Sequence, residues 1–509
     1  MKVSTWAEYA DRLRSTRSGI EKKNIIKELI DETKGMEIAF ATSFLIIDSE
    51  RFISPERNLG VGKKTVRKAA ANISQVSYQD IREKEKEVGK LSIALGRLLT
   101  ETDQKSLVSQ DKESMHLWKI HSKLLDISNS SSENAKMGII QDMFQQSPDE
   151  DIEYVSYALV GDISLGVGAK TILDAVAESY NLDKQEVRNT YYLEPHVGSL
   201  SSFIHDYGEL PNYNPLDNRF KPMLASSDNI SNENDFVYEP KYDGARIIIK
   251  KQDGDVRAYS RSRIDITHNL PELQELELPD CDFVVDGEVI GYNPETGENV
   301  SYQKTMTRVQ RTENIEEARK EVPVEFKLFD LIVWNGIDIS DKSLTARYSC
   351  LRDNFPNVVK RYKGSASSAF DRAVDEGHEG IVVKHRSGVY EFGKRSVLWR
   401  KKKPLKESID LEVVSVKKQR KAGVDGVGAL LLQTREGVTV GKVGTGFTDE
   451  DRSSLWEMHR NSELIGKIVE IEWEELQENN GNYGIRFARY IGLRDDKENA
   501  DTLERIKGL

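Results

Sequence analysis

A lysine, an aspartate and a glycine stand directly before a strand-like run of isoleucines in the stretch EPKYDGARIIIK, residues 239–250. Lys241 is the candidate nucleophile, because a lysine amine attacks phosphorus once it has lost its proton. The ordinary pKa of a lysine is about 10.4, so partial burial or nearby positive charge must lower it. The pattern Lys-x-Asp-Gly is weak by itself, and other motifs must decide whether it carries chemistry.

Two further lysines could act beside Lys241. In the segment WRKKK, Lys401 and Lys403 are two residues apart, so in an extended strand they point to one face while Arg400 and Lys402 point to the other. We expect Lys401 and Lys403 to share a cleft with Lys241. There they would lower its pKa and neutralise charge on a phosphate under attack.

Carboxylates that could bind a metal ion recur along the same region. By the two-residue rule, Asp286 and Glu288 of VVDGEVI lie on one face of a strand. Carboxylates without a cluster of histidines and cysteines favour a hard cation such as Mg²⁺. In EGIVVK, Glu379 and Lys384 are five residues apart, so both reach one ligand only if Glu379 lies in a loop.

The elements that must position these residues change in character along the chain. Residues 1–207 carry helical periodicity, as in IEKKNIIKELIDETKG, where Ile25, Leu29 and Ile30 form one stripe. Residues 208–403 alternate short strands with helical patches, which indicates an α+β domain. Residues 404–509 contain five short strands, typical of a small OB-fold barrel. We expect those strands at LEVVSV, ALLLQT, VTVGKVG, KIVEIEW and RFARYIGL.

One pattern occurs twice in the helical part. NLGVGKKTV begins at residue 58 and SLGVGAKTI at residue 164, and in each a tight turn leads into a helix. Free backbone N–H groups at a helix start can hold a phosphate. The recurrence indicates either two ordinary loop-to-helix junctions or a duplicated element that contacts a nucleic-acid backbone irrespective of sequence.

Composition restricts the class of protein. The chain has 509 residues, 38% apolar and 31% charged, with a net charge of −12. We expect a soluble, cytoplasmic protein, since it shows neither an apolar run long enough for a membrane nor a signal peptide. Two cysteines, Cys281 and Cys350, exclude a disulfide framework and a four-cysteine zinc site. Residues 384–421 hold thirteen lysines and arginines against four acids, either a solvated face or a local basic surface.

Taken in order, the motifs resemble those of one family. KYDGAR, VVDGEVI, FKLFD, EGIVVK, WRKKK and LRDDK follow one another as in ATP-dependent DNA ligases of the archaeal and eukaryotic replicative type, within the covalent nucleotidyltransferase superfamily. The resemblance implies a helical DNA-binding domain, an adenylation domain and an OB-fold domain. Arg400 and Lys402 depart from the family, which usually has apolar residues at these positions, so the outer face of that strand would be exposed or touch DNA.

The resemblance also implies roles for individual residues. Lys241 would take AMP from ATP with Mg²⁺ bound by Glu288 and Glu379, while Lys401 and Lys403 assist. The nucleotide contacts it implies are Glu239 on the adenine edge, Phe329 on the adenine face, Glu288, Arg246 and Arg261 on ribose and phosphate, Arg395 and Lys401 on the nucleotide, and Arg494 and Lys497 on the pyrophosphate.

These assignments imply an enzyme that seals nicks in duplex DNA during replication, repair, recombination and cell division. AMP would pass from the lysine to the 5′-phosphate of the nick and leave when the 3′-hydroxyl attacks. We expect a monomer that acts at the nucleoid. A sliding clamp would bind at Gln104–Val108, although Leu107 and Val108 replace the aromatic pair usual in such a motif.

Three alternatives share part of these signals. An RNA ligase or a capping guanylyltransferase would share the lysine motif and the barrel, but the helical part with its paired turns favours a duplex-DNA enzyme. An NAD-dependent ligase would require the absent cysteine quartet. A non-catalytic duplex-binding protein could keep the same fold, because fold alone does not establish activity.

Overall fold

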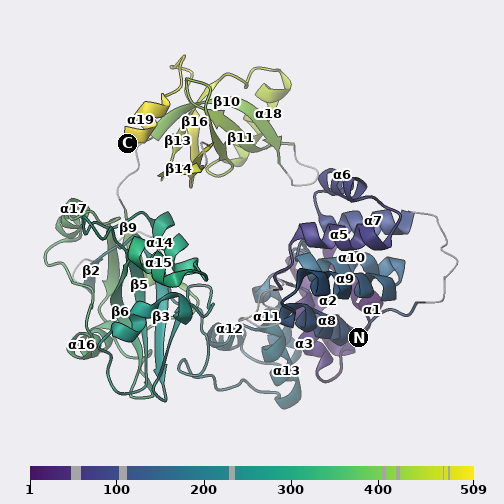
Figure 1. Cartoon of the computed structure of the whole chain (residues 1–509), viewed down its shortest axis with the longest axis horizontal. Helices are drawn as coiled ribbons and strands as arrows, with labels where there is room; N and C mark the ends of the chain where they lie inside the picture. The colour runs from purple at the N-terminus through teal and green to yellow at the C-terminus, as the bar shows by residue number, and fades with distance from the viewer. Residues whose placement is uncertain are drawn as a thin grey trace. The chain divides into compact units, whose positions relative to one another are not determined.

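The computed structural model describes residues 1–47, 59–101, 112–227, 235–403, 408–419, 425–473, 475–479 and 482–508. The chain divides into two compact units, Met1–Lys402 and Lys403–Leu509 (Figure 1). Within the described ranges, no helix is long and apolar enough to cross a membrane.

The first unit begins with an all-α part, as predicted. Its α-helices are α1 Val3–Ser15, α2 Gly19–Glu32, α3 Glu37–Phe44, α5 Lys63–Ile73, α6 Tyr78–Val88, α7 Leu91–Glu101, α8 Leu117–Asn129, α9 Glu133–Gln146, α10 Ile152–Val160, α11 Ala169–Ser179, α12 Lys184–Leu193 and α13 Val197–Tyr207. The stripe of Ile25, Leu29 and Ile30 on α2 is buried, which confirms the amphipathic helix.

The repeat seen in the sequence extends over most of this helical part. Helices α1 and α8 both have 13 residues, α2 and α9 both have 14, and α5 and α11 both have 11. The N-caps of α2 and α9 are Ser18 and Ser132, and each hydroxyl accepts a backbone N–H from the residue three positions on. Residues Lys2 and His116, which precede α1 and α8, pair with each other in an isolated bridge.

The repeat has two halves, the first with α1, α2 and α5 and the second with α8, α9 and α11, and each half packs against the other. Helix α2 of the first half packs against α11, and α9 of the second half packs against α5. At the fourth position of α2, Lys22 donates hydrogen bonds to the carbonyls of Leu165 and Gly166, both at 2.9 Å. At the fourth position of α9, Lys136 donates to the carbonyl of Leu59 at 2.7 Å. Each Leu-Gly-Val-Gly turn is therefore held by a lysine from the other half.

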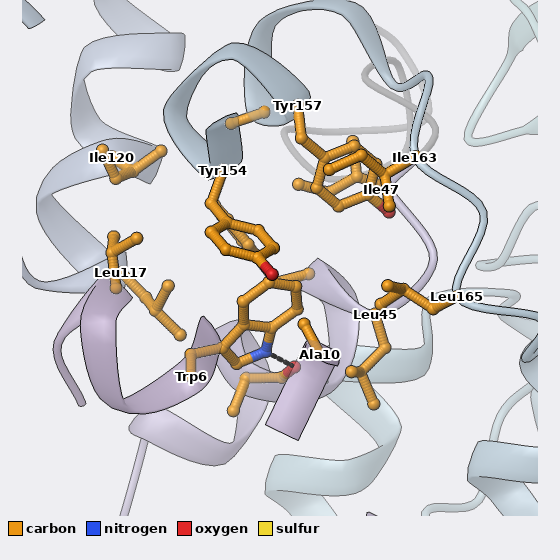
Figure 2. Packing of buried hydrophobic residues seen from close by; sticks show 14 of the residues in the cluster. Trp6, Ala10, Leu45, Ile47, Leu117, Ile120, Tyr154, Tyr157, Ile163 and Leu165 are labelled. Carbon is orange, nitrogen blue, oxygen red and sulfur yellow. Dashed lines mark hydrogen bonds between the residues drawn. The ribbon is translucent and has the colours of Figure 1, made fainter. Parts of the chain in front are cut away.

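Both halves contribute to one hydrophobic core, shown in Figure 2. Trp6 of α1 is completely buried and donates its indole N–H to the carbonyl of Ala41 at 3.0 Å. The ring of Tyr154 meets it edge-on at 5.6 Å between centroids, a favourable arrangement for aromatic pairs. Leu117 and Ile120 of α8 lie beside this pair in the same core.

Replacing Lys22 with methionine should destabilise the helical part. The change leaves the buried carbonyl of Leu165 and the partly buried carbonyl of Gly166 without their charged donor, and such hydrogen bonds contribute about 1.5–3 kcal/mol. We expect a loss of that size in the free energy of unfolding, measured by denaturant titration. Lys27→Met, on the same helix but in a partly exposed ion pair with Glu178, should cost far less. Equal losses would contradict the assignment.

The rest of the first unit is α+β, with two sheets of orders β4-β3-β5-β6-β7 and β1-β9-β8-β2. Their strands are β1 Leu224–Ser226, β2 Phe236–Pro240, β3 Ala245–Gln252, β4 Asp255–Ser260, β5 Phe283–Gly291, β6 Val324–Trp334, β7 Ile337–Asp338, β8 Ile381–His385 and β9 Arg395–Lys402. The helices are α14 Tyr302–Gln310, α15 Ile315–Glu321, α16 Leu344–Asn354 and α17 Ala366–Asp375.

Three apolar clusters arrange this part in layers. One cluster lies between the two sheets and includes Ile248, Val284 and Trp399. A second covers the other face of the five-stranded sheet, where α14 and α16 pack. The third lies under α17 on the outer face of the four-stranded sheet. Side chains that point into the space between the two sheets and are not packed in the cluster there can therefore face one another across a pocket.

The second unit is the predicted OB-fold domain, with a five-stranded sheet of order β12-β11-β10-β13-β16. These strands are β10 Ser408–Lys418, β11 Val427–Gln433, β12 Thr439–Val443, β13 Ile468–Glu472 and β16 Arg489–Leu493, with α18 Asp449–Arg460 before β13 and α19 Leu503–Gly508 at the end. A parallel bridge between Thr445, two residues after the end of β12, and Arg489 at the start of β16 joins the two edges of the sheet, and this closes the barrel.

The strand predicted over RFARYIGL is present as β16, but it begins at Arg489, three residues later than expected. Another strand, β15 (Asn482–Arg486), ends at the first residue of this stretch. Phe487 has a φ of 52°, a left-handed conformation that interrupts an extended strand. Strand β15 pairs with β14 (Glu475–Asn479) in a hairpin that sequence reasoning did not foresee.

Candidate active site

A pocket of about 240 Å³ lies between the two sheets of the α+β part. Strands of both sheets and the segments that follow them contribute residues to its lining. Its lining residues are Leu224, Ala225, Glu239, Pro240, Lys241, Tyr242, Arg246, Arg261, Glu288, Phe329, Val359, Val382, Lys384, Arg395, Trp399 and Lys401.

Lys241 follows β2 directly and is held by its backbone as well as its side chain. Its N–H donates to the carbonyl of Gly380 at 2.8 Å, and its carbonyl accepts the N–H of Glu379 at 3.0 Å. The ammonium group forms an ion pair with the carboxylate of Glu379. Glu379 lies in the loop before β8, the position that the spacing to Lys384 required.

Gly244 explains why a glycine follows the lysine and aspartate. A Cβ at this position would lie 2.3 Å from the carbonyl oxygen of Val289 and 2.8 Å from Cγ of Glu288. Strand β3 therefore begins in close contact with the backbone of β5, which no other residue type allows without displacement. This approach places Glu288 beside the lysine motif.

Glu288 is a half-buried carboxylate on β5 that faces the pocket. Burial raises its pKa to about 7, while the positive charges of Arg246 and Lys241 act in the opposite direction. Among the described residues, none donates a hydrogen bond to its side chain. A carboxylate that is poorly compensated in this way fits a cationic ligand.

Arg246 lines the pocket and is held there by an acidic partner. Its guanidinium forms two hydrogen bonds of 2.5 Å to Asp286, which also accepts the hydroxyl of Tyr390 at 2.5 Å. The same guanidinium lies 4.6 Å from the ring centroid of Phe329. Asp286 therefore holds Arg246 under the aromatic ring, whereas Glu288 on the same strand points into the pocket.

Glu239 and Phe329 form the inner part of the pocket. Glu239 is 2% exposed and pairs with Lys384 at 2.7 Å and with Arg361 at 3.0 Å. Lys384 also donates to the carbonyl of Phe329 at 3.1 Å, and its ammonium lies 4.5 Å from that ring's centroid. Trp399 meets Phe329 edge-on at 5.9 Å. The arrangement combines a carboxylate with an aromatic face.

Comparison with known proteins decides the family. The sequence models described as "DNA ligase N terminus", "ATP dependent DNA ligase domain" and "DNA ligase OB-like domain" match residues 2–177, 222–403 and 420–494. The "DNA ligase" of Thermococcus onnurineus (strain NA1) is 28% identical over 100% of this chain and 98% of its own.

The chain belongs to the ATP-dependent DNA ligases.

It is an enzyme of the nucleotidyltransferase superfamily. The "DNA ligase" of Thermococcus fumicolans is 29% identical over 100% of this chain and 98% of its own, and that of Methanothrix thermoacetophila is 28% identical over 98% and 97%. A solved structure described as "Pmar-Lig_PreS3" shares the fold with a TM-score of 0.60 and 18% identity, covering 96% of this chain and 99% of that one.

The remaining predicted residues of the ligase pocket lie at different places around it. Lys401 lines the pocket from β9, whereas Lys403 is not among the lining residues; it follows the end of β9 at Lys402 and is the first residue of the second unit. Arg261 and Arg395 are exposed at its rim. Lys401 therefore shares the pocket with Lys241, as expected, while the ammonium of Lys241 pairs with the carboxylate of Glu379.

The basic residues that depart from the ligase pattern pack on aromatic rings. Arg400 lies 5.0 Å from the ring centroid of Phe236, and Lys402 lies 4.7 Å from that of Phe370. These contacts are cation–π interactions on the face of the sheet opposite the pocket. In the segment WRKKK, Lys401 therefore faces the pocket, while Arg400 and Lys402 lie on aromatic rings on the other face of the sheet.

In the OB-fold domain, the two predicted cations share one acidic partner that the sequence analysis missed. Arg494 donates to Asp410 at 3.1 and 3.3 Å, and Lys497 pairs with the same carboxylate. Arg494 also forms two hydrogen bonds to Asp496. Asp410 is 4% exposed. Nothing in LEVVSV, the strand expected just after it, marked this residue.

Replacing Glu288 with glutamine should make the stability of the ligase less dependent on pH. The pKa of a glutamate is about 4.3 in an unfolded chain, whereas the pKa of Glu288 in the fold is about 7. The ionised carboxylate therefore destabilises the fold by an amount that increases from about pH 4.3 and reaches its full size above about pH 7. Glutamine has no such cost. We expect equal melting temperatures near pH 4 and a variant more stable by roughly 2–4 °C or more near pH 8.5.

Scanning calorimetry at both pH values would measure this difference. Glu277→Gln, an exposed position in the same domain, serves as the control and should change neither value. A Glu288→Gln protein that melts at or below the wild-type temperature near pH 8.5 would contradict the raised pKa.

Proposed function

We propose that this ligase seals nicks in duplex DNA through an AMP group carried on Lys241. The observation that supports this most directly is the pocket itself. It places the amine of Lys241 beside Glu379 and in one cavity with Glu239, Glu288, Phe329 and Lys401. An amine, an aromatic face and carboxylates in one cavity are what nucleotidyl transfer to a lysine requires.

In the first step, the amine of Lys241 attacks the α-phosphorus of ATP and pyrophosphate leaves. The ammonium must first lose its proton, and Glu379, which already pairs with it, is positioned to accept that proton. Lys401 would neutralise charge on the phosphate from β9. The clamped backbone of Lys241 fixes the origin of the side chain, so the amine can approach in line with the leaving group.

The nucleotide would be held by the inner residues of the pocket. We assign Phe329 to the face of adenine, Glu239 to its amino group and Glu288 to the ribose. Arg261 and Arg395, exposed at the rim, would contact ribose and phosphate oxygens. Arg246 would act from beneath Phe329, because Asp286 already occupies its guanidinium.

Mg²⁺ fits the donor set of this pocket. Glu288 lacks a hydrogen-bond donor within the described part of the chain, and Glu379 lies at the nucleophile, so both could supply carboxylate oxygens. Nowhere in the described ranges do three or more histidine, cysteine, aspartate or glutamate residues form a metal-binding group. Bound Mg²⁺ supplies charge neutralisation on the phosphates.

Two further transfers would complete the reaction on DNA. AMP passes from Lys241 to the 5′-phosphate of the nick, and the 3′-hydroxyl then displaces it. The starts of α5 and α11 favour contact with the phosphate backbone, since Gly62 and Gly168 provide no side-chain cap and leave N–H groups available. Such contacts are independent of base sequence.

For the partners and location of the ligase, we propose a monomer that acts in the cytoplasm at the nucleoid. Replication, repair and recombination all leave nicks that need sealing, and cell division depends on their completion. The segment Gln104–Val108, which would bind a sliding clamp, lies outside the described residues. The match to a DNA ligase N-terminal model favours duplex DNA over RNA or a cap as the acceptor.

Incubation with Mg²⁺ and α-labelled ATP should label the denatured protein, and Lys241→Ala should remain unlabelled. Lys251→Ala, a lysine of β3 outside the pocket lining, provides the control and should label like the wild type. Label on the Lys241→Ala protein would place the nucleophile elsewhere. A folded wild type that takes no label would contradict the proposed reaction.

Lys497→Ala should lose self-adenylation while it still seals a nick that already carries AMP. The reason is that Lys497 and Arg494 are assigned to the pyrophosphate, which takes part in the first step alone. We expect a loss of about 10²-fold or more in the first step, a size typical for a charged group on a developing anion. Gel assays on nicked and pre-adenylated duplexes measure the two steps separately. The opposite pattern would overturn this division of roles.

A further inference from the structure

An arginine that the reaction scheme does not use lies directly behind Glu239. Arg361 is in the segment after α16, and its Nε donates to Oε1 of Glu239 at 3.0 Å. Its guanidinium carbon lies 3.3 Å from the ring centroid of Tyr348 on α16. Its side chain is 18% exposed and does not line the pocket. Arg361 therefore acts on the pocket through Glu239.

The carboxylate of Glu239 is fixed from two sides. Lys384 of β8 pairs with Oε2 at 2.7 Å, and Arg361 binds Oε1. The segment that carries Arg361 is anchored to β2 itself, because the N–H of Tyr362 donates to the carbonyl of Tyr238 at 2.8 Å. The hydroxyl of Tyr348 donates to the carbonyl of Val359, a lining residue, at 2.9 Å. Glu239 cannot turn without breaking one of these contacts.

A fixed, charged carboxylate selects among purines by hydrogen bonding. An ionised carboxylate only accepts, and each of its oxygens has a further lone pair beyond the one given to a cation. The 6-amino group of adenine donates, whereas the 6-carbonyl of hypoxanthine or guanine only accepts and would be repelled. Selectivity therefore depends on the orientation and charge of Glu239.

We propose that Arg361 is a positioning residue that sets the base selectivity of the ligase by holding Glu239 toward the 6-amino group of ATP. This inference rests on the proposed function, in which Glu239 reads the adenine edge. Tyr348 supports the arrangement by stacking on the guanidinium, which keeps the Nε–H aimed at the carboxylate.

Arg361 can be tested separately from the pocket wall, whereas Lys384 cannot. Lys384 contacts Glu239, the carbonyl of Phe329 and the rings of both Phe329 and Trp399, so its removal would disturb the stacking surface as well. Arg361 contacts Glu239 and the outlying Tyr348. A change at Arg361 should therefore affect the reading of the base edge and leave base stacking intact.

The experiment compares ATP with purine riboside triphosphate, which lacks the 6-amino group, in the rate of self-adenylation of the whole chain. The wild type should favour ATP by about 10-fold or more in kcat/KM, as expected for a hydrogen bond to a charged group. In Arg361→Met this ratio should fall to within about 3-fold, while the rate with purine riboside triphosphate stays close to the wild-type rate. Inosine triphosphate should gain relative to ATP in the same variant.

Matched variants separate positioning from a structural role. Arg352→Met removes an exposed arginine of α16 that pairs with Asp353, and it should keep the wild-type ratio. Arg361→Lys should restore part of the ratio, and Tyr348→Leu should lower it, so a poorly folded Arg361→Met protein would not leave the question open. In a Glu239→Gln background, Arg361→Met should change the ratio no further.

Several results would overturn the inference. One is a ratio of kcat/KM for ATP over purine riboside triphosphate that is unchanged in both Arg361→Met and Tyr348→Leu. Another is an equal loss of the adenylation rate with both nucleotides, because that result indicates a structural role for Arg361. A wild type that labels with ATP but prefers it by less than a factor of about 2 would remove the basis for selectivity. A wild type that labels with neither nucleotide would overturn the proposed function along with the inference.

Discussion

Burial of charge is the constraint on which the adenylation part of this ligase depends. Lys384 and Glu239 are each 2% exposed, and Arg347 and Asp330 are completely buried as a pair. A charge out of water is costly unless a partner of opposite sign and its remaining hydrogen bonds are all supplied. Arg347 meets this need with Asp330 and with the carbonyl of Gly388. Each such pair forces two distant segments into one fixed register.

The pocket follows from that register. Because Asp286 takes the guanidinium of Arg246, β3 and β5 cannot slide, and Gly244 lets them approach closely enough to place Glu288 beside Lys241. Phe329 is fixed at its carbonyl by Lys384, which is itself fixed by Glu239. The apolar clusters on either side would tolerate other side chains of similar volume, whereas these ion pairs admit few substitutes.

The limits of prediction from sequence follow from the same physics. The all-α, α+β and OB-fold parts were predictable because apolar periodicity is local. Lys241 could be singled out because its neighbours form a recognisable motif, and it lines the pocket. Arg361 and Asp410 were not predictable, since their partners are 122 and 84 residues away along the chain and no local pattern marks them.

Rules based on strand geometry also have limits. The alternation rule grouped Lys403 with Lys401, but it holds only within a strand, and β9 ends at Lys402. The left-handed conformation of Phe487 was similarly invisible, because it is a non-glycine residue.

The exchanged lysines of the helical part have one more consequence. Lys22 and Lys136 each serve a turn in the opposite half, an arrangement with the reciprocity of a symmetric dimer in which every contact occurs twice. Here a single chain carries both partners, so their effective concentration is set by the connecting residues and does not fall when the protein is diluted. The two turns therefore keep their geometry at any concentration of the protein.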